Sequence, residues 1–544
     1  MSSLLVLLAL GAITLVYFTF GTKKSNTGEK PLLKLPLIGD LHSSPIQKPL
    51  LNWDKWAVQN GPIAVPKLFG LIPIVVLNTQ EAVTELFSKR SQWYSNRPAS
   101  VSMEMITGAE PGKSRFTLMH DYDDHLKLHH RILSPSLGAP AAPKYQPLME
   151  LEGKQLLFDL ITKLEKGKNG IISTDDIYPL LERTQSSVIL GLHYGLRIPT
   201  FENHTLHEII DIQSKVTHLA GNPQLPDMMS FLRHLPASIS PWQKAADKLF
   251  ATQEDLYMRL FKHGRDSEGW NATKQAIATA EKYAPKNEPV SDLDLAFTLA
   301  TSIQGGMETS PRQLLWLFIA ALQDRSFLTK AHEVLDNFVG RDRLPAFSDR
   351  SNLTYIDAVT HELFRWRPIS PGSIPRRADS DDSFANTKIK KGWTVIANAW
   401  AVGRDEKVFD PSLGDTQSFV PDRWIKTNSE SGAQRLRSEL PLPVFGQGRR
   451  ICQGKRVATD GTFMQVACLL WAFDVEPLDD AEGEEGEGKV DPWEMVVVGF
   501  MTMPRPRRFR LKPRGDWVVD VVKRTWEGAE KGVNVVMGGG RDVE

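Results

Sequence analysis

The sequence predicts a mainly helical protein with a smaller set of strands, an α+β fold in which the helices dominate. Apolar residues recur at helical spacing within residues 145–285, and an unusually apolar helical pattern covers residues 292–322. Short runs at residues 63–65 and 71–77, and a pair of runs within residues 389–402, are typical of strands. A length of 544 residues suggests three or four domains. The motifs described below converge on one site, however, so we expect a single catalytic domain over residues 47–514.

The composition is that of an ordinary globular protein, with 41% hydrophobic and 24% charged residues. Lysine plus arginine equals aspartate plus glutamate, at 65 each, so nothing in the charge balance indicates a nucleic-acid partner. The two cysteines, Cys452 and Cys468, cannot form a disulfide framework and fit a reducing compartment. Cys468 lies in an apolar run and is expected to be an inert core residue.

The first apolar segment, residues 4–21, carries no charge and is just long enough to span a bilayer as a helix. Four lysines follow it and none precedes it, which by the positive-inside rule places the rest of the chain in the cytosol. A cleaved signal peptide is the alternative, but no charged residue precedes the apolar stretch. With a retained anchor, the Asn-x-Ser/Thr sites at Asn203, Asn271 and Asn352 would be chance matches.

Residues 22–46 are proline-rich and predict a stiff connector behind the anchor. Further along the chain, residues 81–89 and 121–133 predict short helices, the second of which contains His130 and Arg131. Residues 270–286 are more polar and predict a loop with a broken helix. The glycine-rich acidic run at residues 479–489 predicts a solvated loop, and residues 515–544 predict a partly disordered tail.

The middle of the helix predicted over residues 292–322 reads Gly305-Gly306-Met307-Glu308-Thr309. Glycines inside a helix are costly unless they serve a purpose, and a threonine hydroxyl can bond the carbonyl four residues back or a ligand. The structural alternative is a kinked core helix with a solvated acid, since Pro311 alone would explain a bend.

Three charged residues predict a buried clamp. Glu362 and Arg365 are three apart on a helix predicted over residues 355–367, so they share a face. Arg423 follows in the segment of residues 419–424, and a carboxylate between two guanidiniums can satisfy several donors at once. An exposed helical ion pair is the alternative for Glu362 and Arg365.

The stretch of residues 445–454 places Cys452 in a glycine-rich loop, followed by an apolar run over residues 457–471. Such a loop can hold a thiolate against a metal ion while backbone N–H groups and a positive charge, such as Arg450, stabilise the sulfur. Gly448 and Gly454 allow tight turns and the close approach of a flat ligand. The alternative is a buried structural cysteine.

The fixed residues of this loop, Phe-x-x-Gly-x-Arg-x-Cys-x-Gly, resemble the heme-binding loop of the cytochrome P-450 superfamily. The glycine-threonine helix, the Glu362 and Arg365 helix, and the segment containing Arg423 occur in the family's order, so the resemblance covers about residues 30–514. It implies a helix-rich lobe and a small strand-rich lobe with heme b between them. The residues that it assigns to heme are Cys452 as the axial metal ligand, Phe445, Gly448 and Gly454 in the loop, and Arg450 and Arg376 as propionate partners.

The resemblance also implies that Thr309 acts at bound O2 and that Glu308 helps to supply protons. In one place the chain departs from the family: the usual Trp-x-x-x-Arg of the helix over residues 121–133 is replaced by Leu126 and His130. Either His130 or the adjacent Arg131 could replace the missing propionate contact. Residues 99–118 correspond to the variable loop that covers the substrate.

The function implied is a monooxygenase that inserts one oxygen atom from O2 into a hydrophobic small organic substrate, in the manner of fungal secondary-metabolite enzymes. No flavin or nicotinamide domain is visible, so electrons from NADPH must come through a separate, membrane-bound flavoprotein reductase. The implied location is the endoplasmic reticulum membrane, with the catalytic domain in the cytosol. Two other classes stay open: a heme-thiolate isomerase, dehydratase or coupling enzyme on the same fold, and a non-catalytic heme sensor.

Overall fold

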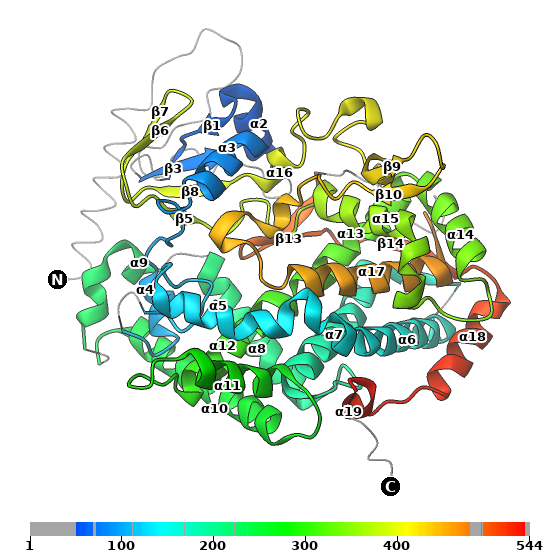
Figure 1. Cartoon of the computed structure of the whole chain (residues 1–544), viewed down its shortest axis with the longest axis horizontal. Coiled ribbons are helices and arrows are strands. Elements are labelled where there is room, and N and C mark those ends of the chain that lie inside the picture. Colours follow the sequence, from blue (N-terminus) through cyan, green and yellow to red (C-terminus); the bar gives the residue numbers. More distant parts are fainter. Residues whose placement is uncertain are drawn as a thin grey trace, which may run out of the picture.

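The computed structural model describes residues 50–538, apart from residues 69–71, 111–112, 168, 222–223, 237, 479–490 and 492 (Figure 1). The predicted anchor at residues 4–21, the predicted connector at residues 22–46 and the acidic run at residues 479–489 lie outside the described residues. In the described part, no helix is both long and apolar enough to cross a membrane.

Helices form most of the described chain. The largest sheet lies toward the upper left of Figure 1, whereas β9 (Ile425–Thr427), β10 (Gln434–Leu436), β13 (Met501–Pro504) and β14 (Arg508–Pro513) lie on the other side. The longer helices are α2 (Leu51–Asn60), α5 (Asp124–Leu137), α6 (Ala142–Lys166), α7 (Thr174–Tyr194), α8 (His204–Gly221), α10 (Pro241–Asp266), α11 (Ala272–Tyr283), α12 (Asp292–Gly306), α13 (Thr309–Gln323), α14 (Ser326–Phe338), α15 (Thr354–Trp366), α17 (Lys455–Ala472) and α18 (Asp516–Glu527). The short ones are α3 (Gln80–Thr84), α4 (Val101–Met105), α9 (Leu225–Met228), α16 (Ala399–Val402) and α19 (Val533–Val536).

The largest sheet has five strands in the order β1 (Ile63–Ala64), β3 (Ile72–Leu77), β8 (Thr394–Ala397), β5 (Arg376–Arg377), with β2 (Lys67–Leu68) also paired to β3. Only β3 and β8 run parallel within it. The smaller sheets comprise β11 (Phe473–Glu476), β14 (Arg508–Pro513) and β4 (Ile171–Ser173); β12 (Met495–Val498) and β13 (Met501–Pro504); β9 (Ile425–Thr427) and β10 (Gln434–Leu436); and β6 (Asp382–Phe384) and β7 (Thr387–Ile389). A mainly helical protein with small sheets is therefore confirmed.

Two local predictions were wrong, and in both places an asparagine cap decides the structure. Residues 270–286 contain the continuous helix α11, because the side chain of Asn271 accepts a hydrogen bond from the amide of Lys274 (3.0 Å). Residues 389–402 do not form two strands paired with each other: β7 pairs with β6, and β8 pairs with β3 and β5. After β8, the Asn398 side chain accepts from the amide of Ala401 (3.1 Å) and starts α16.

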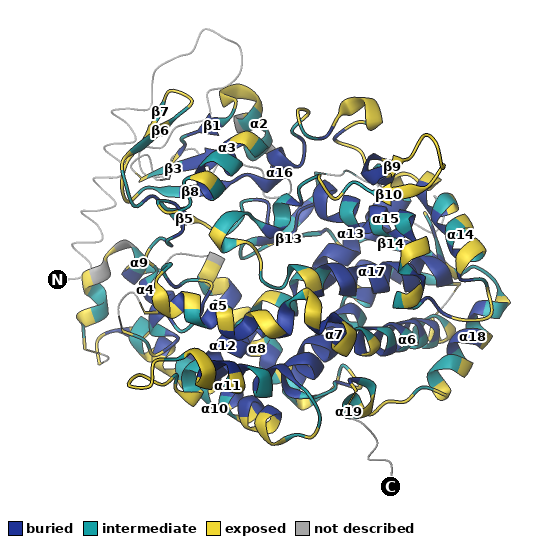
Figure 2. Cartoon of the chain, viewed as in Figure 1, coloured by how far each residue is buried: buried dark blue, intermediate teal, exposed yellow. Residues whose placement is uncertain are grey.

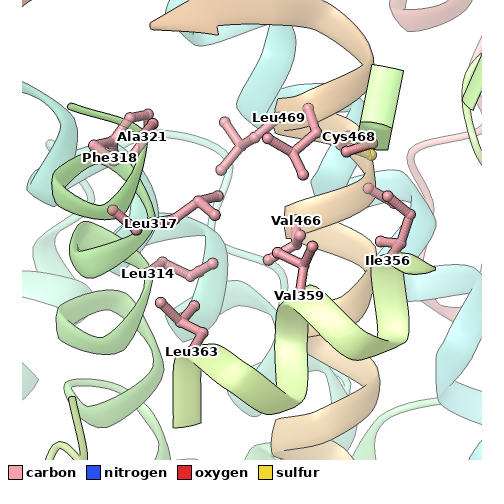
Figure 3. Close-up of a cluster of buried hydrophobic side chains, with 14 of the residues drawn as sticks. Leu314, Leu317, Phe318, Ala321, Ile356, Val359, Leu363, Val466, Cys468 and Leu469 are labelled. Carbon is pink, nitrogen blue, oxygen red and sulfur yellow. The ribbon is translucent and has the colours of Figure 1, made fainter. Parts of the chain in front are cut away.

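A core of apolar side chains joins α13, α15 and α17 (Figure 3). Leu314 and Leu317 of α13 meet Val359 and Leu363 of α15, and Val466 of α17 lies among them. Helix α17 is buried along most of its length, from residue 459 to its end, as its dark blue ribbon shows in Figure 2. Since close-packed interiors resist small displacements, α17 holds the loop that precedes it in a fixed position.

The single helix predicted over residues 292–322 is divided into α12 and α13 by a break at residues 307–308. The hydroxyl of Thr309 donates to the carbonyl of Gly305 (2.7 Å), so it satisfies an acceptor at the break. Glu308 is buried and paired with Arg312 (2.8 Å), not solvated.

The predicted clamp is present and fully buried. The Glu362 carboxylate accepts from both nitrogens of the Arg365 fork (2.6 and 2.7 Å) and from Nε of Arg423 (3.1 Å). It also accepts from the indole of Trp424 (2.9 Å) and the amide of Val420 (2.8 Å). A charged group that meets this many donors fixes geometry more than it adds stability.

Within the described residues, the segment after residue 514 contains helices α18 and α19. Helix α18 packs against α6 through Val518, Val521 and Val522, which are buried. The ring of Trp517 meets that of Trp471 edge to face, with centroids 4.8 Å apart. Met537, beyond α19, is buried in a cluster that also contains Leu148.

Candidate functional site

One cavity of about 510 Å³ collects the residues that the sequence motifs single out. Its walls include the Cys452 loop, both sides of the break between α12 and α13, and part of α8. Seven of the nine residues that the sequence assigns to heme or oxygen chemistry line this cavity: Cys452, Arg450, Arg376, His130, Phe445, Gly454 and Thr309.

 Gly448 and Glu308 are the two predicted site residues that do not line the cavity.

The side chain of Cys452 is exposed, and it lines this cavity. Burial raises the pKa of the Cys452 thiol, while the backbone N–H groups of Gly454 and Lys455 and the charge of Lys455 act in the opposite direction. Lys455 therefore supplies positive charge near the sulfur. A sulfur with two amides aimed at it and one open side is suited to hold a metal ion as a thiolate.

The rest of the loop holds Cys452 in place. The amide of Cys452 donates to the carbonyl of Phe445 (2.8 Å), whose ring packs edge to face on Phe364. Gly448 has a φ of +67°, and a Cβ atom on it would lie 1.9 Å from the carbonyl oxygen of Phe87. Gly448 is thus needed for a close backbone approach to the π-helical turn η2 (Glu85–Lys89), whereas Gly454 leaves space beside the sulfur.

Three arginines line the cavity side by side: Arg97, Arg376 and Arg450. Among the described residues their guanidiniums form no ion pair, and the nearby carboxylate of Asp121 is already paired with Arg377 (2.9 Å). Their hydrogen bonds go to backbone carbonyls: Arg97 to Leu118, Ile374 and Pro375; Arg376 to Tyr94 and Gln447; Arg450 to Ser95, Thr117 and His120.

Burial and mutual repulsion make these charges unfavourable without an anion. Burial, with Arg450 and Arg376 nearby, lowers the pKa of Arg97 well below its ordinary value. Burial also lowers the pKa of Arg376 to about 9 and that of Arg450 to about 10. A cavity with three such cations and one accessible sulfur fits a metal-bearing ligand that carries carboxylates, which is the chemistry of heme.

Of the neighbouring residues His130 and Arg131, only His130 lines the cavity. His130 lines the cavity, and burial, with Arg450 and Arg97 nearby, lowers its pKa to about 4, so the ring is neutral near pH 7. Arg131 instead lies over the ring of Tyr283, 4.9 Å from its centroid, and is not part of the cavity wall. Of the two alternatives for the missing propionate contact, only His130 is in reach of the cavity.

Of the two residues predicted for oxygen chemistry, Thr309 lines the cavity and Glu308 does not. Thr309 lines the cavity next to Gly305, where nothing lies within 4 Å of an added Cβ atom. The carboxylate of Glu308 bonds to Arg312 outside the cavity wall, and burial raises the pKa of Glu308.

Sequence reasoning missed Arg97 as a site residue and Lys455 as the cation beside the sulfur. Nothing in local spacing connects Arg97 to Arg376 and Arg450, because the chain brings the three together only through the fold. An arginine that folding places among carbonyl groups has no local signature.

Comparison with known proteins agrees with this geometry. A family profile described as Cytochrome P450 matches residues 30–499. Cytochrome P450 monooxygenase criE of Aspergillus cristatus is 29% identical over 486 residues, which cover 87% of this chain and 84% of that protein. Cytochrome P450 monooxygenase drtD of Aspergillus calidoustus is 27% identical and covers 92% of this chain and 89% of its own length.

Among solved structures, a zebra fish cytochrome P450 with abiraterone is similar, with a TM-score of 0.65 and 21% identity. It covers 86% of this chain and 100% of the solved chain. At this identity the likeness establishes the fold alone.

Replacement of Cys452 by alanine is expected to remove the axial thiolate and, with it, the red-shifted absorption band of the reduced carbon monoxide complex. Cys468→Ala is the matched control, because the Cys468 sulfur is sealed in the core against Met464 (3.9 Å). A difference spectrum of each purified variant measures the band. A Cys452→Ala protein that kept the full band would disprove the assignment of the ligand.

Proposed function

The chain belongs to the cytochrome P450 family and is a cytochrome P450 monooxygenase, and we propose that it oxidises a hydrophobic small organic substrate of fungal secondary metabolism. The observation that supports this most is a single cavity in which the Cys452 sulfur, three unpaired arginines and Thr309 meet. The relatives add support, since they are fungal monooxygenases, one of them named for echilunin. Membership of the family implies a heme-thiolate cofactor and the use of O2.

In this proposal the chain holds heme b from two sides. The sulfur of Cys452 would be the protein's ligand to the iron, and Arg97, Arg376 and Arg450 would hold the two carboxylates, with neutral His130 as a further polar neighbour. Bound heme with an axial thiolate supplies the activation of O2 and the cleavage of its O–O bond. The apolar remainder of the cavity keeps bulk water out and binds the substrate through burial of apolar surface.

Thr309 is proposed to hold a proton at its Oγ1 atom on the cavity side of the helix break. Its hydroxyl now donates to the carbonyl of Gly305 (2.7 Å) and can turn toward a ligand without a change of backbone. Glu308 would act through Thr309, because its own carboxylate is held by Arg312 (2.8 Å). Burial raises the pKa of Glu308, while the ion pair with Arg312 acts in the opposite direction.

The proposal also includes partners and location. Electrons from NADPH would come from a separate, membrane-bound flavoprotein reductase. Residues 4–21 would anchor the chain in the endoplasmic reticulum membrane, with residues 22–46 as the connector and the catalytic domain in the cytosol. The uncharged run followed by lysines supports this orientation.

Thr309→Ala removes the proposed proton-holding hydroxyl and leaves the rest of the cavity in place. Loss of a positioned proton-transfer group typically lowers rates by about 10²–10⁴. Water can replace a hydroxyl here, so we expect a decrease near the lower end in product formed per NADPH consumed, with more hydrogen peroxide released. The measurement uses the holoenzyme with its reductase and candidate fungal metabolites, followed by mass spectrometry.

Thr279→Ala is the control for this variant, since Thr279 makes the same bond to the carbonyl four residues back (2.6 Å) on α11, outside the cavity wall. It should keep the ratio of product to NADPH. Turnover that requires neither NADPH nor O2, together with an unchanged Thr309→Ala variant, would replace the monooxygenase with an isomerase or dehydratase.

The membrane anchor predicts that full-length protein stays in the pellet when microsomes are washed with alkaline carbonate. Removal of residues 1–46 should release a large part of it into the supernatant. Protease added to sealed microsomes should digest the catalytic domain. Protection of that domain, or a glycan on Asn203, would show the opposite orientation.

A further inference from the structure

The carbonyl groups freed at the helix break have a second side-chain partner besides Thr309. Gln213 of α8 is only 5% exposed and lines the same cavity as Cys452. Its Nε2 atom donates to the backbone carbonyl of Gln304 (3.1 Å) and to the hydroxyl oxygen of Thr217 (3.3 Å). Because a backbone carbonyl can only accept, the nitrogen of the amide must face Gln304, and this fixes the orientation of the Gln213 side chain.

The same bonds leave the oxygen of that amide free. No residue that the structure describes donates to Oε1 of Gln213, and this atom is not among the unpartnered polar atoms sealed inside the protein. It is therefore open to the cavity that Gln213 lines. An acceptor that loses water without gaining a donor is unfavourable, so a ligand that displaces water at this point binds best when it brings a donor of its own.

The cavity wall is mainly apolar, with a minority of polar side chains. Met103, Phe116, Ile189 and Val216 line the cavity together with Gln213. On α12, the hydroxyl of Thr301 is engaged with the carbonyl of Phe297 (3.1 Å). A fixed acceptor in an apolar wall is the usual arrangement by which a pocket orients an apolar ligand.

We propose that Oε1 of Gln213 is an anchor for the substrate, and that it accepts a hydrogen bond from a hydroxyl or amide N–H group on an otherwise apolar molecule. This rests on the proposed function, in which the cavity holds the substrate. Since Gln213 is bonded to Gln304, the residue before Gly305, the anchored group lies beside the helix break. Gln213 thereby selects substrates that already carry a donor and determines which end of the molecule is held there.

Matched pairs of apolar alcohols and their methyl ethers test this anchor, for example 1-adamantanol, borneol and cedrol with the corresponding ethers. The two members of a pair share the apolar body, and only the alcohol can donate. Dissociation constants are measured on the holoenzyme, by the shift of the heme absorption band and by calorimetry. Wild-type protein should bind the alcohols more tightly than the ethers by roughly three- to tenfold, the usual effect of one hydrogen bond.

In Gln213→Met, which keeps the length of the side chain but removes the acceptor, the preference should fall to about one. Gln253→Met is the matched control, because Gln253 is also buried and donates to a backbone carbonyl, that of Ile106 (2.7 Å). Its own free oxygen is sealed inside the protein, away from the cavity, so this variant should keep the wild-type preference.

Absence of a preference for the alcohols across the panel in wild-type protein would overturn the anchor, and so would a preference that persists in Gln213→Met. The absence of a preference in wild-type protein overturns the anchor even if Gln213→Met does not fold. The carbon monoxide band separates the two proposals: wild-type protein with the band but without the preference refutes only the anchor, and wild-type protein without the band refutes the proposed function.

Discussion

Repulsion among three arginines, the buried Arg97 and Arg376 and the half-buried Arg450, is the constraint around which the rest of the site is arranged. Like charges removed from water are unfavourable unless an opposite charge joins them. Of the described carboxylates nearby, Asp121 is already bonded to Arg377 and Asp123 to His120. Carbonyl groups satisfy the donors but do not neutralise the charge. An anionic ligand in the cavity would reverse the sign of the interaction, so that ligand binding stabilises the folded protein.

The small sheet and the helical core supply the rigidity that this arrangement needs. Arg376 begins β5, and the bridge between Asn96 and Arg377 brings Arg97 beside it. From the other side, α17 fixes the loop with Arg450 and Cys452 through its packing on α13 and α15 (Figure 3). Arg97 and Arg376 are thus positioned by the sheet, and Cys452 and Arg450 by the loop that precedes α17.

Local spacing in the sequence was enough to predict the Cys452 loop, the Glu362 clamp and the glycine-threonine motif, because each depends on residues close together in the chain or on a fixed pattern. It could not predict Arg97, whose partners come from distant segments. The helix α11 and the turn into α16 were misjudged because single side chains, Asn271 and Asn398, cap these helices where average propensity indicates loop or strand. In the C-terminal segment, the apolar spacing of α18 was overlooked.

Binding of heme b and of heme dimethyl ester to the heme-free protein tests the role of the arginines most directly, because the ester keeps the iron and the ring but lacks both carboxylates. Charge-assisted hydrogen bonds contribute about 1.5–3 kcal/mol each, so two lost carboxylates should weaken binding by on the order of 10²–10⁴. Heme b should also raise the midpoint of unfolding in denaturant far more than the ester does. Equal affinity and equal stabilisation by the two compounds would contradict the account.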